Sequence, residues 1–400
     1  MHARLRLLFL AMVVLACRGE ARQAGAQGEL AAMVDSLRRP VEKAVGLSFK
    51  TPPASAMRSR DQVRAYLIAK LDEELPPARM RGIETAYRLL GLFPDTLELR
   101  GLLLDLYTEQ VAGYYDPDSA MLFGVEGADR TQLRLVLAHE MVHALQGQYL
   151  PLDSILSASS NNDRLTAAQA VLEGQATLSS LDVLAPGQNV ARNPEFWELY
   201  REQVRAQQTS MPVFRKAPLI LRESLIFPYL QGAEFMHWWM QSPRADTVPY
   251  GPLMPVSSEQ ILHPERYKRG DRPVELRIVP ALPRTYEDVL GENEIRVILA
   301  TLAGSDEVQT VVPIGWGGDR YRLTESPDGP ALVWFVLWDD ARAGDRFMRA
   351  AAAGLRRTPR AWYRTNLDEL TIDGSPGLRY VIAPEKWEGW GRLPVAERVR

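Results

Sequence analysis

The chain has 400 residues, of which 46% are hydrophobic and 24% are charged. This composition is typical of a folded globular protein and excludes a disordered, fibrous or membrane-embedded chain. The formal net charge of -3 leaves no basic excess to neutralise phosphates, so we expect no nucleic acid partner and no binding to an anionic membrane surface. A peptide or another neutral substrate remains open.

The N-terminus has the pattern of an export signal. Residues 1–16 begin with positive charges at Arg4 and Arg6 and continue as an apolar run that is too short to span a bilayer. The run ends in Val14-Leu15-Ala16-Cys17, which resembles the lipobox at which bacterial lipoprotein precursors are acylated on cysteine and cleaved just before it. We therefore expect a signal peptide at residues 1–16 and a lipid anchor on Cys17.

The anchor would be the protein's contact with the membrane. Cys17 is the only cysteine of the chain, so no intramolecular disulfide can form. Because Arg18 rather than an acidic residue follows it, the resemblance implies sorting to the outer membrane, with a tether at residues 17–28 that clears the membrane surface. The alternative is secretion after type I signal cleavage behind Ala24-Gly25-Ala26, which has the small-x-small pattern.

Residues 29–270 are expected to form a mainly helical domain. From Leu30 to Leu104 the apolar residues recur mostly at helical spacing, with a break at Pro76-Pro77. Residues 113–118 then predict a strand followed by an Asp-Pro-Asp turn, and residues 121–125 predict a second strand. The sequence therefore predicts a small edge hairpin before the segment that carries the chemistry.

The helix after the hairpin contains two histidines at a metal-binding spacing. Asp129 or Thr131 can cap this helix, and its apolar residues recur at helical spacing until Gly147. His139 and His143 are four residues apart and therefore lie on one face of the helix. Their imidazole nitrogens can point at a single ion.

Glu140 would lie beside that ion without binding it. A zinc held by neutral nitrogens and one carboxylate keeps a position open for water, lowers the pKa of that water towards ~7, and lets a neighbouring carboxylate remove its proton. Two histidines and a glutamate among apolar residues would also be costly to desolvate with nothing bound. We predict Zn²⁺ as the cofactor, His139 and His143 as ligands, and Glu140 as the general base.

A third protein ligand is needed to complete such a site. Tyr149 stands where three-histidine sites carry their last histidine, which disfavours that subtype. Residues 161–163 form a second cap cluster, and the helix that follows contains Glu173 among small and apolar residues, where exposure to water is less natural. We predict Glu173 as the third ligand, and Glu223 and Glu234 remain as other candidates.

Residues 271–400 are expected to form a second domain, because strands and helices alternate there. The expected elements are strands over residues 274–279, 321–324 and 331–338 and a helix over residues 292–302. The Gly-Trp-Gly-Gly-Asp phrase at residues 315–319 has no Lys-Ser or Lys-Thr after it, so it is no phosphate loop and we interpret it as a tight turn. The sequence therefore predicts a C-terminal α/β domain and an α+β fold for the whole chain.

Several short sequence segments together resemble those of a largely uncharacterised family of bacterial exported proteins. Members of this family are identified as zinc metallopeptidases of the gluzincin type. The segments lie at residues 110–117, 139–146, 172–174, 227–229, 258–265 and 315–319. Gluzincins combine a His-Glu-x-x-His helix with a glutamate from a second helix. The resemblance implies zinc ligation by His139, His143 and Glu173, with Glu140 catalytic.

The likeness to zincins also implies a place for the substrate. In zincins the strand before the metal helix lies along the cleft and pairs with an extended substrate. By analogy this assigns substrate binding to one predicted edge strand, made of Met121, Leu122, Phe123, Gly124 and Val125. The backbone of this strand would supply the hydrogen bonds.

A peptidase also needs a donor that stabilises the oxyanion of the transition state. His263, Tyr229 and Tyr114 could each serve, and His263 and Tyr229 are the candidates we retain. Ser257 to Gln260 resembles a capping box that opens a short helix, so His263 would lie at a defined position. The alternative for His263 is a structural histidine at a helix end, and His237 is expected to pack among aromatic residues.

The sequence thus predicts a zinc metallopeptidase that hydrolyses peptide bonds of a peptide or protein substrate in the cell envelope. One alternative is a non-catalytic envelope scaffold or binding lipoprotein with a structural or vestigial metal site. Another is a zinc amidase that acts on non-peptide amides with the same ligands. A fourth protein ligand would favour the scaffold, whereas an open ligand position would favour an enzyme.

Overall fold

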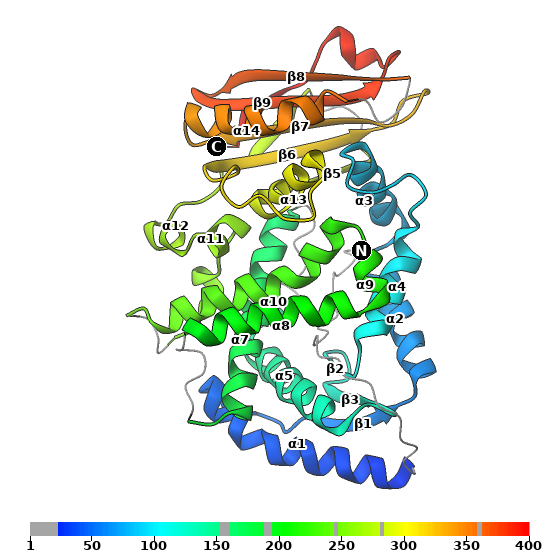
Figure 1. Cartoon of the computed structure of the whole chain (residues 1–400), viewed down its shortest axis with the longest axis vertical. Helices are drawn as coiled ribbons and strands as arrows, with labels where there is room; N and C mark the ends of the chain where they lie inside the picture. The colour runs from blue at the N-terminus through cyan, green and yellow to red at the C-terminus, as the bar shows by residue number, and fades with distance from the viewer. Residues whose placement is uncertain are drawn as a thin grey trace.

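The protein is an α+β protein, which confirms the expected fold class. A computed structural model describes residues 23–152, 155, 161–187, 194–243, 247–280, 284–357 and 362–399. Figure 1 shows a mainly helical part with a small sheet and, at the opposite end of the molecule, a larger sheet. The predicted signal peptide and Cys17 lie outside the described residues. Within the described ranges, no helix is long and apolar enough to cross a membrane.

Four helices make up the N-terminal part. They are α1 (Gln23–Val45), α2 (Arg60–Glu74), α3 (Pro77–Leu89) and α4 (Leu99–Gln110). The helix α1 begins inside the predicted tether of residues 17–28, because Leu30 and Leu37 bury one of its faces in a hydrophobic cluster with Met141 and Ala176. The predicted tether is therefore helical from Gln23 onwards.

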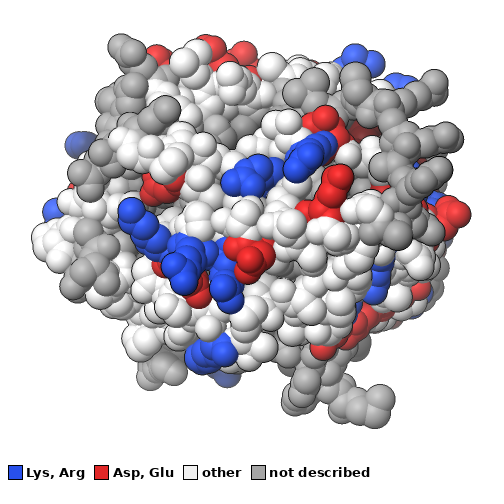
Figure 2. All heavy atoms as spheres, turned by 90° about the horizontal axis from the view of Figure 1, so that it is seen from below, with Lys and Arg blue, Asp and Glu red and all other residues white. Residues whose placement is uncertain are grey.

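The face of the molecule that carries α1 has charges of both signs. Figure 2 shows Lys and Arg side chains beside Asp and Glu side chains on this face, within a largely uncharged surface. On α1 itself, Arg38 Nη2 lies 3.7 Å from Asp35 Oδ1. The described part of this face therefore has no extended area of positive charge. Such an area is what attracts phosphate backbones.

The small sheet has three strands, β1 (Ala54–Arg58), β2 (Gly113–Asp116) and β3 (Met121–Val125), in the order β1-β3-β2. The predicted hairpin is present as the antiparallel pair β2 and β3. The prediction that Met121 to Val125 is an edge strand is wrong, because β1 pairs in parallel with its whole length, from Ala54 opposite Met121 to Arg58 opposite Val125. A substrate strand cannot add to β3, since both of its edges are already paired.

Three long helices form the centre of the molecule: α5 (Arg130–Tyr149), α7 (Asn162–Leu184) and α10 (Leu219–Met240). Asp129 caps α5 by accepting from the N–H groups of Thr131 and Gln132, and Asn161 caps α7. Both helices therefore begin where the sequence predicts. Beside them lie α8 (Pro194–Ser210) and α9 (Pro212–Lys216).

The C-terminal half is built around a five-stranded sheet in the order β5-β6-β7-β9-β8. Its strands are β5 (Tyr286–Asp288), β6 (Trp316–Thr324), β7 (Ala331–Trp338), β8 (Tyr363–Ile372) and β9 (Ser375–Pro384). All neighbouring strands in it run antiparallel, so the expected α/β arrangement of this half is wrong. A parallel sheet needs a crossover at every connection, whereas β6 and β7 are joined by a short turn between Thr324 and Ala331.

Shorter elements complete this half. They are η2 (Gly251–Leu253), α11 (Ser258–Leu262), α12 (Pro264–Arg269), β4 (Leu276–Val279), α13 (Gly291–Ala303), α14 (Ala341–Leu355), η3 (Glu388–Gly391) and β10 (Val395–Arg398), with β10 antiparallel to β4. One hydrophobic cluster contains side chains from both halves, for example Leu103 and Tyr114 with Ile298 and Trp334. The division into domains at residues 270 and 271 stays a prediction.

The Gly-Trp-Gly-Gly-Asp phrase opens strand β6 and is not a tight turn. The ladder to β7 shifts register between Trp316 and Gly318. Gly318 has a φ of 143°, and a Cβ there would collide with the backbone of Val274, so this position requires glycine. This bulge places Asp319 in the interior. Asp319 Oδ1 accepts from Gly291 N at 2.9 Å and from Trp316 Nε1 at 3.1 Å. The phrase therefore builds a buried acceptor that holds the start of α13.

The other oxygen of Asp319 accepts from Leu290 N and Trp334 Nε1, both at 3.0 Å. Asp319→Asn replaces one of the two oxygens by an NH₂ group, which faces N–H donors and leaves them unpaired. We expect a loss of roughly 2 to 4 kcal/mol in the free energy of unfolding, measured by chemical denaturation. Asp328→Asn, in an exposed turn, is the control and should change stability little; equal stability of the two variants would contradict this account.

A second buried aspartate joins the two halves of the molecule. Asp163, in the first turn of α7, accepts from the backbone N–H of Ser258 at 2.9 Å and also from the Ser258 hydroxyl. The hydroxyl oxygen of Ser258 in turn accepts from the N–H of Asn293 in α13 at 3.1 Å. Burial raises the pKa of Asp163 to about 7, although the bonds from Ser258 oppose this shift.

The raised pKa of Asp163 makes stability depend on pH. Because the folded pKa of about 7 lies above the ordinary value of 3.8, the fold favours the protonated carboxyl. Its contribution to stability is complete below that ordinary value and is lost as the pH rises through about 7. Between about pH 5 and pH 8, the free energy of unfolding of the wild type should fall by at least about 1 kcal/mol more than that of Asp163→Asn, because the asparagine stays neutral over this range. Parallel denaturation curves for the two proteins would contradict the assignment.

Candidate metal centre

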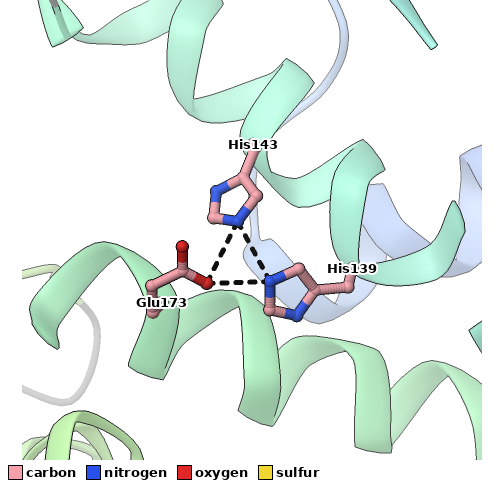
Figure 3. Close-up of side chains that lie close together, drawn as sticks. All are labelled: His139, His143 and Glu173. Carbon is pink, nitrogen blue, oxygen red and sulfur yellow. Dashed lines mark hydrogen bonds and ion pairs between the residues drawn. The ribbon is translucent and has the colours of Figure 1, made fainter. Parts of the chain in front are cut away.

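Two histidines of α5 and one glutamate of α7 converge inside the protein. Figure 3 shows the side chains of His139, His143 and Glu173 turned toward one another, and one ligand atom from each lies within 4.8 Å of the other two. All three residues are buried. Among the described residues, this is the one group of at least three His, Cys, Asp or Glu side chains found close enough to hold a metal ion.

The distances within the group fit a small metal ion. His139 Nε2 lies 2.9 Å from Glu173 Oε2, His143 Nε2 lies 3.4 Å from the same oxygen, and the two Nε2 atoms are 3.0 Å apart. Tetrahedral ligands at zinc bond lengths of about 2.0 to 2.1 Å are separated by about 3.3 Å. The three residues predicted as ligands could therefore hold one metal ion with little movement.

Close helix packing beside Glu173 joins α7 to α10. The next residue in α7, Gly174, faces Gly232 of α10, and a side chain on Gly174 would overlap the backbone of Gly232. A side chain on Gly232 would in turn overlap the carbonyl group of Ala170. The two backbones touch at these glycines, as the small residues around Glu173 predicted. This contact fixes the position of Glu173 relative to α10.

The charges of the group stabilise one another. Burial lowers the pKa of His139, and the bond to Glu173 opposes this effect. Burial is also the largest effect on His143 and acts to lower its pKa, but the charge and hydrogen bond of Glu173, the charge of Glu140 and the bond to Gln146 together outweigh it, so the pKa of His143 is raised. Burial acts to raise the pKa of Glu173, yet the charge of His143 and the bond to His139 hold it down at about 2. Glu173 is therefore a carboxylate at neutral pH, which is the form that binds metals.

Glu140 lies next to the group and is fully buried. Its Oε2 accepts from the backbone N–H of Tyr115 at 2.9 Å. Tyr115 belongs to β2, which is an edge strand because it pairs with β3 on one side only. The unpaired edge of β2 therefore faces the metal helix at this point, and it, rather than β3, is the strand next to the site.

Tyr229 is the one tyrosine candidate that the structure brings to the centre. Its ring, on α10, lies 5.9 Å from the imidazole of His139 between centroids, and its hydroxyl is hydrogen bonded to Glu173. Burial, together with the charges of Glu173 and Glu140, raises the pKa of Tyr229 well above its ordinary value. The hydroxyl therefore keeps its proton and can act as a donor.

His263 and Tyr114 are engaged elsewhere. His263 Nε2 lies 2.8 Å from Glu292 Oε1 of α13, at the junction of α11 and α12, which is the structural alternative that the sequence left open. The hydroxyl of Tyr114 accepts from Arg58 Nη1 at 2.6 Å, and its ring stacks on Tyr66. These contacts account for both side chains within the fold.

The other residues weighed at the sequence level also have structural contacts. Glu223 pairs with Arg205, and Glu234 pairs with Arg201. Neither glutamate belongs to the metal-binding group of the described residues. His237 packs against the ring of Trp197, with centroids 5.4 Å apart, as expected for a histidine among aromatic residues.

Sequence reasoning noted Gln175 as a possible hydrogen-bonding residue behind the ligands but missed Gln146 and Tyr250. Gln146 Oε1 lies 2.8 Å from His143 Nδ1, and Gln175 Oε1 lies 2.8 Å from Gln146 Nε2. Tyr250 donates its hydroxyl proton to the same oxygen of Gln175. The spacing of Gln146, three residues after His143, was the one available signal, because residues three apart share a helix face.

The glycine contact leads to a prediction about both stability and metal affinity. Gly232→Ala should push α10 away from α7, lower the free energy of unfolding by about 3 kcal/mol, and weaken metal binding because Glu173 moves. Thermal unfolding with and without added zinc measures both effects. Gly28→Ala is a matched control in α1, where nothing lies within 4 Å of an added Cβ. A Gly232→Ala protein as stable as this control would contradict the packing argument.

Comparisons with known proteins give limited information. A family described as a domain of unknown function, DUF8575, matches residues 280–386, within the C-terminal half. No curated protein matches the chain. A crystal structure of a "putative hydrolase with a novel fold" from Chloroflexus aurantiacus is similar, with 18% sequence identity and a TM-score of 0.41, covering 64% of this chain and 93% of that one. This level of similarity establishes neither a common fold nor a common activity.

Proposed function

We propose that the protein is a zinc-dependent metallopeptidase. The observation that carries the proposal is the convergence of His139 Nε2, His143 Nε2 and Glu173 Oε2 within one buried group, with Glu140 beside it. Two imidazole nitrogens and one carboxylate form a donor set that suits zinc and that, in hydrolases, leaves a coordination position for water or substrate. A peptide bond is the substrate group that this chemistry commonly cleaves.

A zinc ion held by these three side chains would supply a Lewis acid that polarises a carbonyl group and acidifies water. Glu140 would act as the general base: its carboxylate would take a proton from the attacking water and deliver it to the leaving amine. The N–H of Tyr115 holds Glu140 Oε2 in place, so the orientation of the general base is set by strand β2. The unpaired edge of β2 is also where an extended peptide can lie along the site.

Tyr229 completes the proposed machinery. Its raised pKa keeps the hydroxyl protonated, so the group can donate a hydrogen bond to negative charge that develops on the substrate oxygen. In the absence of substrate the same hydroxyl is bonded to Glu173. We propose Tyr229, rather than His263, as the oxyanion donor, because Tyr229 lies against a ligand whereas His263 is paired with Glu292.

Export and lipidation remain part of the proposal. The pattern of residues 1–16 and Cys17 supports an envelope lipoprotein that acts on a peptide or protein in the periplasm or at the outer membrane. In cells fed labelled palmitate, wild type should carry the label and Cys17→Ser should not. An unlabelled wild-type protein in the culture medium would instead support secretion after type I cleavage.

The enzyme proposal is tested with the chain from Arg18 onwards, by measuring zinc content and the hydrolysis of casein and of a peptide library. Glu140→Gln should keep zinc and lose at least about 10²-fold in activity, because only the proton transfer is removed. His143→Ala should lose both zinc and activity. Glu223→Gln, at the ion-paired glutamate, is the matched control and should keep both.

Tyr229→Phe should keep zinc and lower kcat by about 10²-fold with little change in KM, because it removes a donor that acts in the transition state. Equal kcat values for this variant and wild type would overturn the role of Tyr229. A zinc-replete wild type that cleaves no peptide would overturn the peptidase proposal in favour of a scaffold or of an amidase. A wild type without zinc would overturn the metal site itself.

A further inference from the structure

A chain of buried amides lies behind the ligand His143. Gln146 Oε1 lies 2.8 Å from His143 Nδ1, and Gln146 Nε2 donates to two acceptors, the carbonyl oxygen of Leu172 at 3.1 Å and Gln175 Oε1 at 2.8 Å. Gln175 Oε1 also accepts from the hydroxyl of Tyr250. Gln146 and Gln175 are both buried, so a lost hydrogen bond at either amide is not replaced by water.

One backbone group determines which atom donates and which accepts in each of these hydrogen bonds. The carbonyl oxygen of Leu172 can only accept, so the group of Gln146 that faces it must be the NH₂ group. The other end of the same amide, Oε1, must then face His143, and an oxygen without a proton needs a donor there. His143 therefore carries its proton on Nδ1.

The second proton of Gln146 Nε2 fixes the rest of the chain. It points at Gln175, which must present its oxygen, and Tyr250 must then donate rather than accept. Reversing Gln146 would place its oxygen against the carbonyl oxygen of Leu172, and reversing Gln175 would place two NH₂ groups against each other. The arrangement requires a proton on Nδ1 of His143. In the neutral imidazole, the Nε2 lone pair then points toward His139 and Glu173.

We propose that Gln146 is the positioning residue of the metal centre: it holds His143 in the one tautomer whose Nε2 can bind a metal, and it does so without adding charge. This inference rests on the proposed zinc site. Metal-binding histidines commonly donate their second N–H to a carboxylate, a backbone carbonyl or water. Here a neutral amide takes that place, so the group behind His143 adds no negative charge to the site.

The tautomer is measured without metal and without substrate. In metal-free protein labelled with ¹⁵N-histidine, at about pH 9 so that the imidazoles are neutral, two-bond ¹H–¹⁵N correlations should show the proton of His143 on Nδ1. In Gln146→Leu, which removes the acceptor, this preference should disappear. A proton on Nε2 of His143 in the wild type would overturn the inference.

Zinc affinity, measured by competition with a chromogenic chelator, gives a second readout. Gln146→Leu should bind zinc about 10- to 100-fold more weakly than wild type. Gln146→Glu should recover part of the lost affinity, because one carboxylate oxygen accepts from Nδ1 in the same position while the other meets the carbonyl oxygen of Leu172 where the wild type has a donor. Gln148→Leu is the control on the same helix, where the side chain bonds to Thr51 and Lys50, and it should bind zinc as wild type does.

These results separate the inference from the proposed function. Equal zinc affinity in Gln146→Leu and wild type, or no recovery in Gln146→Glu, would overturn the positioning role even if the protein is an active peptidase. A wild type that binds no zinc would overturn the proposed function, while the tautomer of His143 in the metal-free protein would still decide the inference. Should Gln146→Leu fail to fold, the wild-type spectrum and Gln146→Glu still provide the test.

Discussion

The burial of two imidazoles and two carboxylates in one place is the constraint on which the rest of this structure depends. His143 and Glu140 are wholly buried, and unpaired polar groups at such depth are costly. Each therefore has a partner on another element: Glu140 takes a backbone N–H from β2, and His143 takes Glu173 from α7, besides the amide of Gln146 on its own helix. The close glycine contact between α7 and α10 lies next to Glu173 and holds it relative to α10.

The C-terminal half supports α7 at the start of this helix, away from Glu173. The helix that carries Glu173 begins at the buried Asp163, which holds Ser258 of α11, and Ser258 holds the N–H of Asn293 in α13. The start of α13 is in turn held by Asp319 of the large sheet. A continuous set of buried hydrogen bonds thus runs from the sheet to the metal-binding helix, and it gives the C-terminal half a structural role at the site.

Local signals in the sequence predicted much of this architecture. Asp129 and Asn161 mark the starts of α5 and α7 because a capping side chain acts on its own neighbours, and the spacing of His139 and His143 places both on one helix face. Glu173 was identified from its small and apolar neighbours, which reflect the contact of α7 with α10.

What the sequence did not predict depends on contacts between distant segments. Strand β1, Ala-Ser-Ala-Met-Arg, has no β-branched residue and becomes a strand because β3 offers a free edge, which in turn makes β3 central. The sequence analysis placed Asp319 in a turn. Its buried role could not be recognised there, because its four donors include residues up to 29 positions away. The bonds of Gln146 to Leu172 and Gln175 likewise depend on how two helices meet.

X-ray absorption at the zinc edge of the purified protein tests the central claim most directly, because it reports which atoms surround the ion independently of any substrate. The account predicts a single zinc with two imidazole nitrogens and oxygen ligands at about 2.0 to 2.2 Å. The imidazole signal should be reduced in His139→Ala. A protein without zinc, or a zinc environment that is unchanged in His139→Ala, would contradict it.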